Sequence, residues 1–384
     1  PPQGWEVLWV PMIVGLAVGP VFFLVSAQAS LLQRWFAAAP AAGDPYPLYA
    51  ASNLGSFAGL LAYPFWLEPR MALAAQSRIW TLGYLLMIVL VAFAAAARWN
   101  AENSAANPSP SAPPEKNAER LEPRTVLLWL ALAAVPSGLM LSTTTLLTTD
   151  IMAMPLLWVI PLGLYLLSFS VAFSASGDWA RILSGFAPVL LLSAGSLALI
   201  SGGQSNPAIA LAMVALLFVL AVALHGRLYA LRPSTDRLTL FYLIVAAGGA
   251  LGGVFTSLLA PVIFDWVYEH AILLLAAALL LPQRPKVSAL AKFWSRNRTG
   301  NALACALLLV AAFLAWRLAD STAEGRGSEI LAFICVLIAI GMLFIGVRWA
   351  YAAVLALLML GHGGLSTLEL SSQGARSRTY FGVY

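Results

Sequence analysis

Charged residues are scarce in this chain of 384 residues. Only 10% of them are Asp, Glu, Lys or Arg, whereas soluble domains usually carry about 25%. Hydrophobic residues make up 61%. This combination excludes an ordinary soluble domain and predicts a polytopic membrane protein in a lipid bilayer. Membrane topology accounts for the net charge of +5, so no nucleic-acid partner is expected.

Cysteine and histidine are also rare. The two cysteines, Cys305 and Cys335, fall within apolar runs, so we expect small buried side chains and no disulfide or metal framework. The three histidines, His225, His270 and His362, are scattered without the spacing of metal ligands. We therefore expect neither a metal site nor a cofactor.

Apolar runs of about 20 residues, enough to cross a bilayer, recur along the chain. They predict an all-α, polytopic integral membrane helical bundle with about 11–12 transmembrane helices. Only Gly346, Val347 and Arg348 separate the last two runs, which leaves open two short helices or one long tilted helix. The expected spans are 7–29, 48–67, 78–98, 125–148, 154–174, 181–201, 207–224, 238–262, 267–282, 301–318, 329–346 and 347–362.

Lys and Arg are distributed unevenly between the two sides of these spans. Most of the 21 lie in the loops that follow odd-numbered spans. By the positive-inside rule this side is cytoplasmic, and the first span begins outside. The basic stretch Pro282–Thr299 is interpreted as juxtamembrane charge near anionic lipid.

One segment, residues 100–124, is rich in Pro, Ala and Glu and has no apolar period. It is predicted to be a flexible cytoplasmic linker. It separates about three N-terminal membrane helices in residues 1–99 from a main bundle of about nine helices in residues 125–364. Residues 365–384 form a tail that we expect to lead toward a soluble domain.

The stretch His225–Phe264 combines a charged, proline-punctuated hinge with an uncharged run of membrane-spanning length. Inside the run lie two overlapping GxxxG spacings, Gly248/Gly252 and Gly249/Gly253. Glycines four positions apart share one helix face and let another helix backbone approach closely. They predict a helix-packing seam, and a seam that slides or gates is the alternative.

Polar residues gather at two places where lipid would disfavour them. The first is the end of the fourth expected span, with Thr145, Thr149 and Asp150. Threonine hydroxyls can bond to carbonyls of the preceding turn, so a plain helix end is one interpretation. Cation binding or proton handling at Asp150 beside these hydroxyls is the other.

The second cluster begins at Asp44, which precedes an expected helix and is placed to cap it. Tyr49, Ser52, Asn53 and Ser56 follow at helical spacing and form one polar stripe. Such a stripe must face another helix or a cavity, so interhelical hydrogen bonding and a substrate path are both open.

Two further ionisable residues are expected at the membrane interfaces. His225 ends an apolar run beside Arg227, and Glu269 shortly follows Asp265. Spacing alone pairs neither of them with an acid or base.

Three long blocks resemble the membrane region of bacterial fused major-facilitator/spermidine-synthase proteins. They are Asp44–Pro69, Thr145–Ile160 and His225–Phe264. In that family a multi-helix membrane domain precedes a soluble aminopropyltransferase-like domain, whose first strand is similar to Ala375–Tyr384. Arg227 departs from the pattern, which often has Glu there. The resemblance implies a multi-pass protein of the bacterial inner membrane.

The chain lacks the glycine-rich nucleotide loop after a strand that aminopropyl transfer requires. No catalytic residue is therefore assigned, and an enzymatic activity would need a further domain. We expect a transporter-like domain that binds or moves a small polar or cationic solute, with a polyamine as the candidate. A non-catalytic accessory or scaffold subunit of a larger membrane complex is the alternative. The expected solute-binding residues are Asp44, Tyr49, Ser52, Asn53, Thr145, Thr149 and Asp150.

Overall fold

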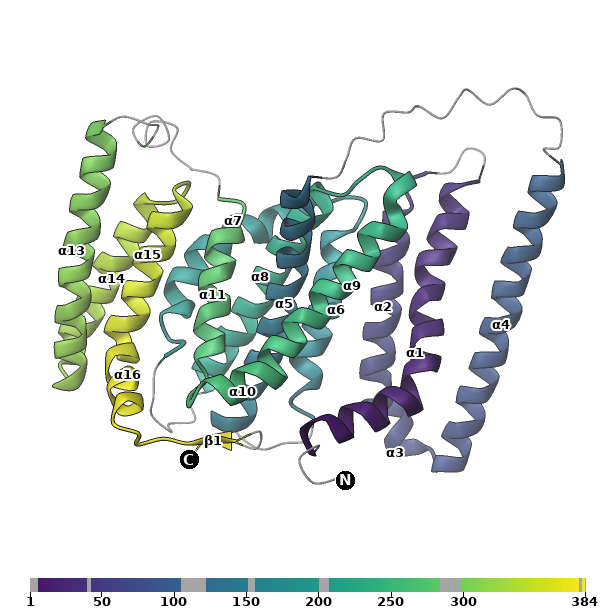
Figure 1. Cartoon of the computed structure of the whole chain (residues 1–384), viewed down its shortest axis with the longest axis horizontal. Helices are drawn as coiled ribbons and strands as arrows, with labels where there is room; N and C mark the ends of the chain where they lie inside the picture. Colours follow the sequence, from purple (N-terminus) through teal and green to yellow (C-terminus); the bar gives the residue numbers. More distant parts are fainter. Residues whose placement is uncertain are drawn as a thin grey trace. The chain divides into compact units, whose positions relative to one another are not determined.

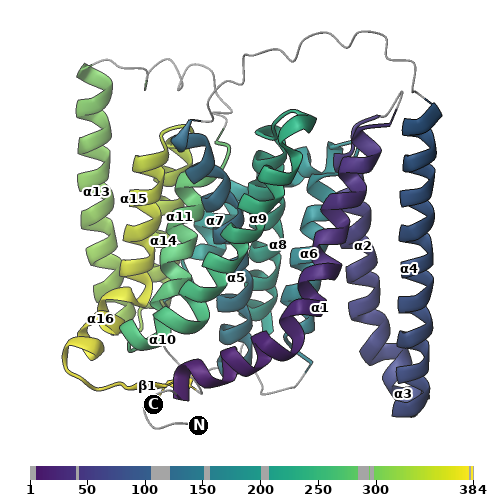
Figure 2. The same cartoon turned by 45° about the vertical axis from the view of Figure 1, so that its right-hand side comes forward.

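A computed structural model describes residues 6–39, 43–104, 122–150, 156–199, 207–283, 294, 298–379 and 382–383. Helices dominate this part of the chain, and strands β1 (Arg378–Thr379) and β2 (Gly382–Val383) form one short antiparallel pair. Arg378 pairs with Val383, and Thr379 pairs with Gly382. The chain is thus an all-α polytopic bundle (Figures 1 and 2).

The chain forms two compact units. Unit 1 comprises Pro1–Glu122 and Pro233–Leu243, and unit 2 comprises Pro123–Arg232 and Ile244–Tyr384. The boundary at Glu122 falls inside the segment expected to be a linker, although helix α4 continues through Ser104. Residues 105–121 of that segment lie outside the described part.

Unit 1 holds three long helical segments. They are α1 (Glu6–Ala37), α2 (Tyr46–Ala62) with the π-helical turn η1 (Tyr63–Leu67) and α3 (Glu68–Arg70), and α4 (Leu73–Ser104). The 3-10 turn η2 (Thr235–Arg237) and the start of α9 also belong to it. Pro64 explains η1, because proline offers no N–H to the carbonyl four residues back and the helix there widens.

Unit 2 holds the remaining helices. In chain order they are α5 (Pro123–Asp150), α6 (Val159–Ala172), α7 (Asp178–Gly195), α8 (Pro207–Ala230), α9 (Leu238–Val254), η3 (Phe255–Leu259), α10 (Ala260–Ile263), α11 (Tyr268–Leu280), α13 (Arg298–Ala323), α14 (Gly327–Leu343), α15 (Arg348–Met359), η4 (Leu360–Gly364) and α16 (Leu365–Ser372). Successive long helices run in opposite directions, as Figure 1 shows.

Each of the twelve expected spans overlaps a helix. Among the described residues, seven helical stretches are long and apolar enough to cross a membrane, and the shorter α6, α11 and α14 are also apolar. The last two expected spans are separate helices, because α14 ends at Leu343 and Gly346 adopts a left-handed φ of 109° before α15 begins.

The core of unit 2 is built around α8, which packs against α5, α6 and α7. Its residues Leu220–Leu224 are completely buried. At its end the indole N–H of Trp129 on α5 donates to the carbonyl of Leu231, 3.1 Å away. A buried helix that is apolar on all sides needs neighbours on all sides, which these three helices supply.

The glycine seam packs α9 against α5. A methyl group on Gly248 would lie 2.6 Å from the carbonyl oxygen of Leu130, and one on Gly252 would meet the carbonyl of Ala134 even more closely. Methyl groups on Gly249 and Gly253 would make ordinary contacts, at 3.9 and 3.7 Å. Only one of the two GxxxG faces therefore brings the backbones together.

Burial differs at four residues from what the sequence suggested. His225 is completely buried rather than solvated, because its ring packs against Phe169 of α6. Glu269 is likewise completely buried. Cys305 and Cys335 are exposed, because they lie on the outward faces of their helices, where an apolar side chain meets lipid.

Candidate functional site

The first turn of α11 joins three other elements of unit 2. Its consecutive residues Tyr268, Glu269 and His270 bind α16, β1 and α5 respectively. The Tyr268 hydroxyl donates to the carbonyl of Thr367 at 3.2 Å and lies 2.7 Å from the Ser371 hydroxyl. Consecutive helical side chains point about 100° apart, so one turn can serve three partners. We call these three residues the α11 hub.

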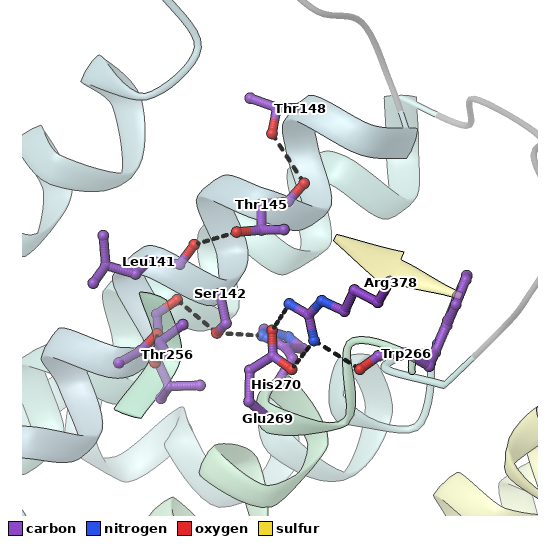
Figure 3. A network of polar contacts seen from close by, with 11 residues as sticks. Leu141, Ser142, Thr145, Thr148, Thr256, Trp266, Glu269, His270 and Arg378 are labelled. Atoms are coloured by element: carbon purple, nitrogen blue, oxygen red, sulfur yellow. Dashed lines mark hydrogen bonds and ion pairs between the residues drawn. The ribbon is translucent and has the colours of Figure 1, made fainter. Parts of the chain in front are cut away.

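The centre of the hub is an ion pair between Glu269 and Arg378. Two guanidinium nitrogens donate to the two carboxylate oxygens at 2.7 and 2.8 Å (Figure 3). The Glu269 side chain is 0% exposed and the Arg378 side chain 6%. Arg378 also donates to the carbonyl of Trp266 at 2.8 Å. This bidentate geometry compensates the loss of hydration of both charges.

A second arginine, Arg376, lies in the same extended segment after α16 as Arg378. The guanidinium of Arg376 lies 4.2 Å from the centre of the Trp266 ring. Side chains two positions apart in an extended chain lie on one side, so Arg376 and Arg378 both face the start of α11. The tail after α16 is thereby fastened back onto the helical bundle.

The third residue of the hub forms a buried pair with α5. The Ser142 hydroxyl lies 2.8 Å from Nδ1 of His270 and also donates to the carbonyl of Leu139 at 3.2 Å. Nearby, Thr256 of η3 approaches the carbonyl of Gly138 at 3.5 Å. Figure 3 shows the Ser142 hydroxyl joined to His270, with Glu269 and Arg378 beside that histidine.

A second serine–histidine pair repeats the arrangement between α6 and α8. The Ser168 hydroxyl lies 2.9 Å from Nδ1 of His225 and donates to the carbonyl of Tyr165 at 2.6 Å. The His225 ring stacks on Phe169, with ring centres 3.6 Å apart. Each serine thus contacts the carbonyl three residues back and one histidine of a packed helix.

We infer from these contacts which histidine nitrogen carries the proton. A serine hydroxyl has one hydrogen, and in both pairs a carbonyl accepts it. With this assignment Nδ1 of His270 and of His225 donates, which leaves Nε2 in each ring with a lone pair. Both Nε2 atoms are buried without a hydrogen-bond partner. The bundle therefore contains two acceptors that are ready for a donor.

The two pairs lie toward opposite ends of unit 2. Ser142 is near the end of α5, and Ser168 is near the end of α6, which runs in the opposite direction (Figure 1). The α11 hub is at the same end as Ser142, together with β1 and α16. Polar groups consequently occur near both ends of the bundle.

The threonine cluster behaves as a hydrogen-bonded helix end where it is described. Thr145 donates to the carbonyl of Leu141 at 3.2 Å, and Thr148 donates to that of Thr144 at 3.0 Å. The side chains of Thr149 and Asp150 lie outside the described residues.

The other expected cluster lies in unit 1. Asp44 is exposed, and its carboxylate accepts a hydrogen bond from the N–H of Tyr46 at 3.1 Å, at the start of α2. Asn53 donates to the carbonyl of Tyr49 at 2.9 Å, while Ser52 is exposed. The Tyr49 ring lies 4.8 Å from that of Tyr242. Within unit 1 this stripe therefore contacts its own helix and an aromatic neighbour.

The expected solute-binding residues thus belong to different units, and sequence reasoning missed the α11 hub. The sequence offered one clue to the hub, namely the acidic residue Glu269 next to a histidine near the start of an expected span. Its partner Arg378 is 109 positions away in the chain, so spacing gave no indication of the pair.

Within the described residues, no group of three or more His, Cys, Asp or Glu is arranged to hold a metal ion. Comparison with known proteins finds no matching family model, no matching curated protein and no matching solved structure.

Proposed function

We propose that this chain is a transporter-like domain of the bacterial inner membrane that binds or moves a small cationic solute through unit 2. A polyamine is the candidate solute. The observation that carries the proposal is the buried carboxylate of Glu269, whose counter-charge comes from Arg378 on an extended segment. Ionisable groups inside membrane bundles commonly mark solute or proton pathways.

The chemistry of the buried groups favours an amine. An ammonium ion donates hydrogen bonds and accepts none. Glu269 offers two acceptor oxygens, and the adjacent His270 offers an Nε2 atom without a partner. The solute-binding residues originally expected are replaced in this proposal by Glu269 and His270, because Asp44 is engaged at its own helix start.

Exchange of one cation for another suits this site. Removing Arg378 alone would leave a buried carboxylate unpaired, at a cost of about 3–5 kcal/mol. An ammonium group that replaces the guanidinium keeps the charge balanced. We propose that the solute competes with Arg378 for Glu269.

Interrupted helices give further support. The π-helical turns η3 and η4 lie within two membrane-spanning stretches. Within η4, Gly363 has a φ of 119°, so the helix is discontinuous there. Discontinuous helices often line solute sites, because they free backbone groups at membrane depth.

The test is spermidine binding to the purified chain in lipid nanodiscs, measured by calorimetry. Arg378→Gln removes the competing cation and is expected to tighten binding about tenfold or more, since 1.4 kcal/mol corresponds to tenfold. The double variant Glu269→Gln/Arg378→Gln is expected to abolish binding. Arg376→Gln, which changes the same segment but not the ion pair, is the matched control.

Unchanged binding in the double variant would exclude Glu269 as the acceptor. The resemblance to fused major-facilitator/spermidine-synthase proteins is the basis for choosing spermidine. A neutral polar analogue of similar length should bind to none of these variants.

A second candidate is a non-transporting accessory or scaffold subunit of a larger membrane complex. It is favoured by α1 and α4, whose membrane-spanning stretches bury no apolar residue within the molecule. A stoichiometric protein partner after mild solubilisation, with no solute binding by any variant, would support it.

A further inference from the structure

Helices α1 and α4 of unit 1 carry the same dipeptide, Arg–Trp, near their C-terminal ends. Arg34 and Trp35 lie in the last turns of α1, and Arg98 and Trp99 lie in the last turns of α4. The C-terminal ends of both helices are at the same end of unit 1 in both views (Figures 1 and 2). The matching ends place two arginines and two tryptophans at one level of the membrane.

These four side chains line one hollow of about 380 Å³, together with Ala38 and Ala95. Arg98 donates to the carbonyl of Ala38 at 3.3 Å, which orients its guanidinium beside the end of α1. Arg34 is exposed, and Trp99 is 69% exposed. The hollow is therefore open to the surroundings and carries two positive charges.

We propose that this hollow, which we call the Arg–Trp hollow, binds the head group of an anionic phospholipid such as phosphatidylglycerol. Guanidinium groups match the oxygen geometry of a phosphate. Tryptophan rings concentrate at the level of lipid head groups. Basic pockets between membrane helices on the cytoplasmic side are suited to anionic lipid heads, and the positive-inside rule assigns Arg34 and Arg98 to that side.

The surfaces below the hollow fit an acyl chain. The buried residues of the spanning stretches of α1 and α4 are the polar Gln33 and Gln76, so the apolar side chains of both helices are free to contact lipid. A second, apolar hollow of about 440 Å³ lies along the same two helices and includes Val25 of α1 and Met87 of α4. Met87 is about three turns before Arg98, or roughly 16 Å, close to half the thickness of the hydrocarbon core. A chain that starts at the Arg–Trp hollow can thus reach the second one.

A protein helix would fit this site less well. It would supply apolar side chains but no phosphate for the two guanidinium groups, whereas a phospholipid supplies the anion and the apolar chains together. The lipid also covers the helix faces that the rest of unit 1 leaves exposed. This inference does not depend on solute transport by unit 2.

The test is native mass spectrometry of the purified chain titrated with phosphatidylglycerol or phosphatidylcholine. Each arginine near an anionic surface contributes about 1 kcal/mol, or about fivefold. The double variant Arg34→Gln/Arg98→Gln should therefore lose roughly thirtyfold of the preference for phosphatidylglycerol. The control Arg78→Gln/Arg181→Gln removes two exposed arginines elsewhere and should keep it.

A steric variant separates the shape of the hollow from its charge. Ala95→Phe fills the hollow without changing the charge and should also reduce retention of phosphatidylglycerol. Soluble glycerol phosphate at the same concentration should not displace the lipid, because it lacks acyl chains. Displacement by glycerol phosphate, equal losses in the control, or unchanged retention in both Arg–Trp hollow variants would overturn the proposal.

Discussion

The Arg378 guanidinium donates hydrogen bonds to both carboxylate oxygens of Glu269, although the two residues are 109 positions apart in the chain. The pair joins the segment after α16 to the start of α11. Because both side chains are shielded from solvent, the charges can be separated only if something else neutralises them. This relationship makes the pair both a structural fastener and a candidate site for an exchangeable cation.

Removing one member of this pair should cost more than removing both. Glu269→Gln leaves the Arg378 guanidinium buried without its carboxylate, for which we expect a loss of about 3–5 kcal/mol in the free energy of unfolding. Glu269→Gln/Arg378→Met should recover most of it. Denaturing-detergent titration of the purified protein measures both values, and a double variant as unstable as the single one would contradict the expectation.

The two faces of the glycine seam should respond differently to alanine. Gly252→Ala forces a methyl group into the Ala134 carbonyl, which is backbone and cannot rotate away, so α9 must move off α5. We expect a clear loss of thermal stability. Gly253→Ala meets only Leu141 at 3.7 Å and should be neutral or stabilising by up to about 1 kcal/mol, from its better helix propensity. Equal melting temperatures of the two variants would contradict the expectation.

For the Ser168–His225 pair, we expect substitution of the serine and substitution of the histidine to change stability by unequal amounts. Ser168→Ala leaves the Nδ1–H of His225 buried without an acceptor, which should cost about 1–3 kcal/mol. His225→Phe removes the unpartnered Nε2 and keeps an aromatic ring against Phe169, so little stability should be lost. The serine keeps its bond to Tyr165.

A double-mutant cycle checks this asymmetry. Ser168→Ala/His225→Phe should be about as stable as His225→Phe alone, because no donor is then left unsatisfied. Ser170→Ala, on the same helix, should change the free energy of unfolding by less than about 0.5 kcal/mol. Ser168→Ala with an equally small effect would exclude the assigned protonation of His225.

The break between α15 and α16 depends on a glycine conformation. Gly363 has a φ of 119°, which side-chain-bearing residues rarely adopt, so Gly363→Ala should destabilise the protein by about 1–3 kcal/mol. Gly327→Ala is the matched control, because nothing lies within 4 Å of a methyl group there and the residue begins a regular helix. Thermal unfolding of the two variants in one detergent distinguishes them, and equal effects would argue against strain at Gly363.

Sequence by itself determined the class of this protein and the order of its helices. Apolar runs and scarce charge are sums over neighbouring residues, so the spans overlap the observed helices. Boundaries were less predictable: α8 extends past His225 because a charged residue near a helix end does not stop the helix. The glycine spacing predicted a close contact between helices. It did not show which of the two glycine faces makes this contact, because both have the same spacing.

Only the tertiary structure decided which groups meet. It showed that Gly248 and Gly252, rather than Gly249 and Gly253, face α5. It also buried Glu269 and His270 and supplied Arg378 and Ser142 as their partners. The physical reason is that helical periodicity fixes the face of a residue but not the distant segment that packs against it. Partners more than a hundred positions apart are chosen by packing of the whole bundle.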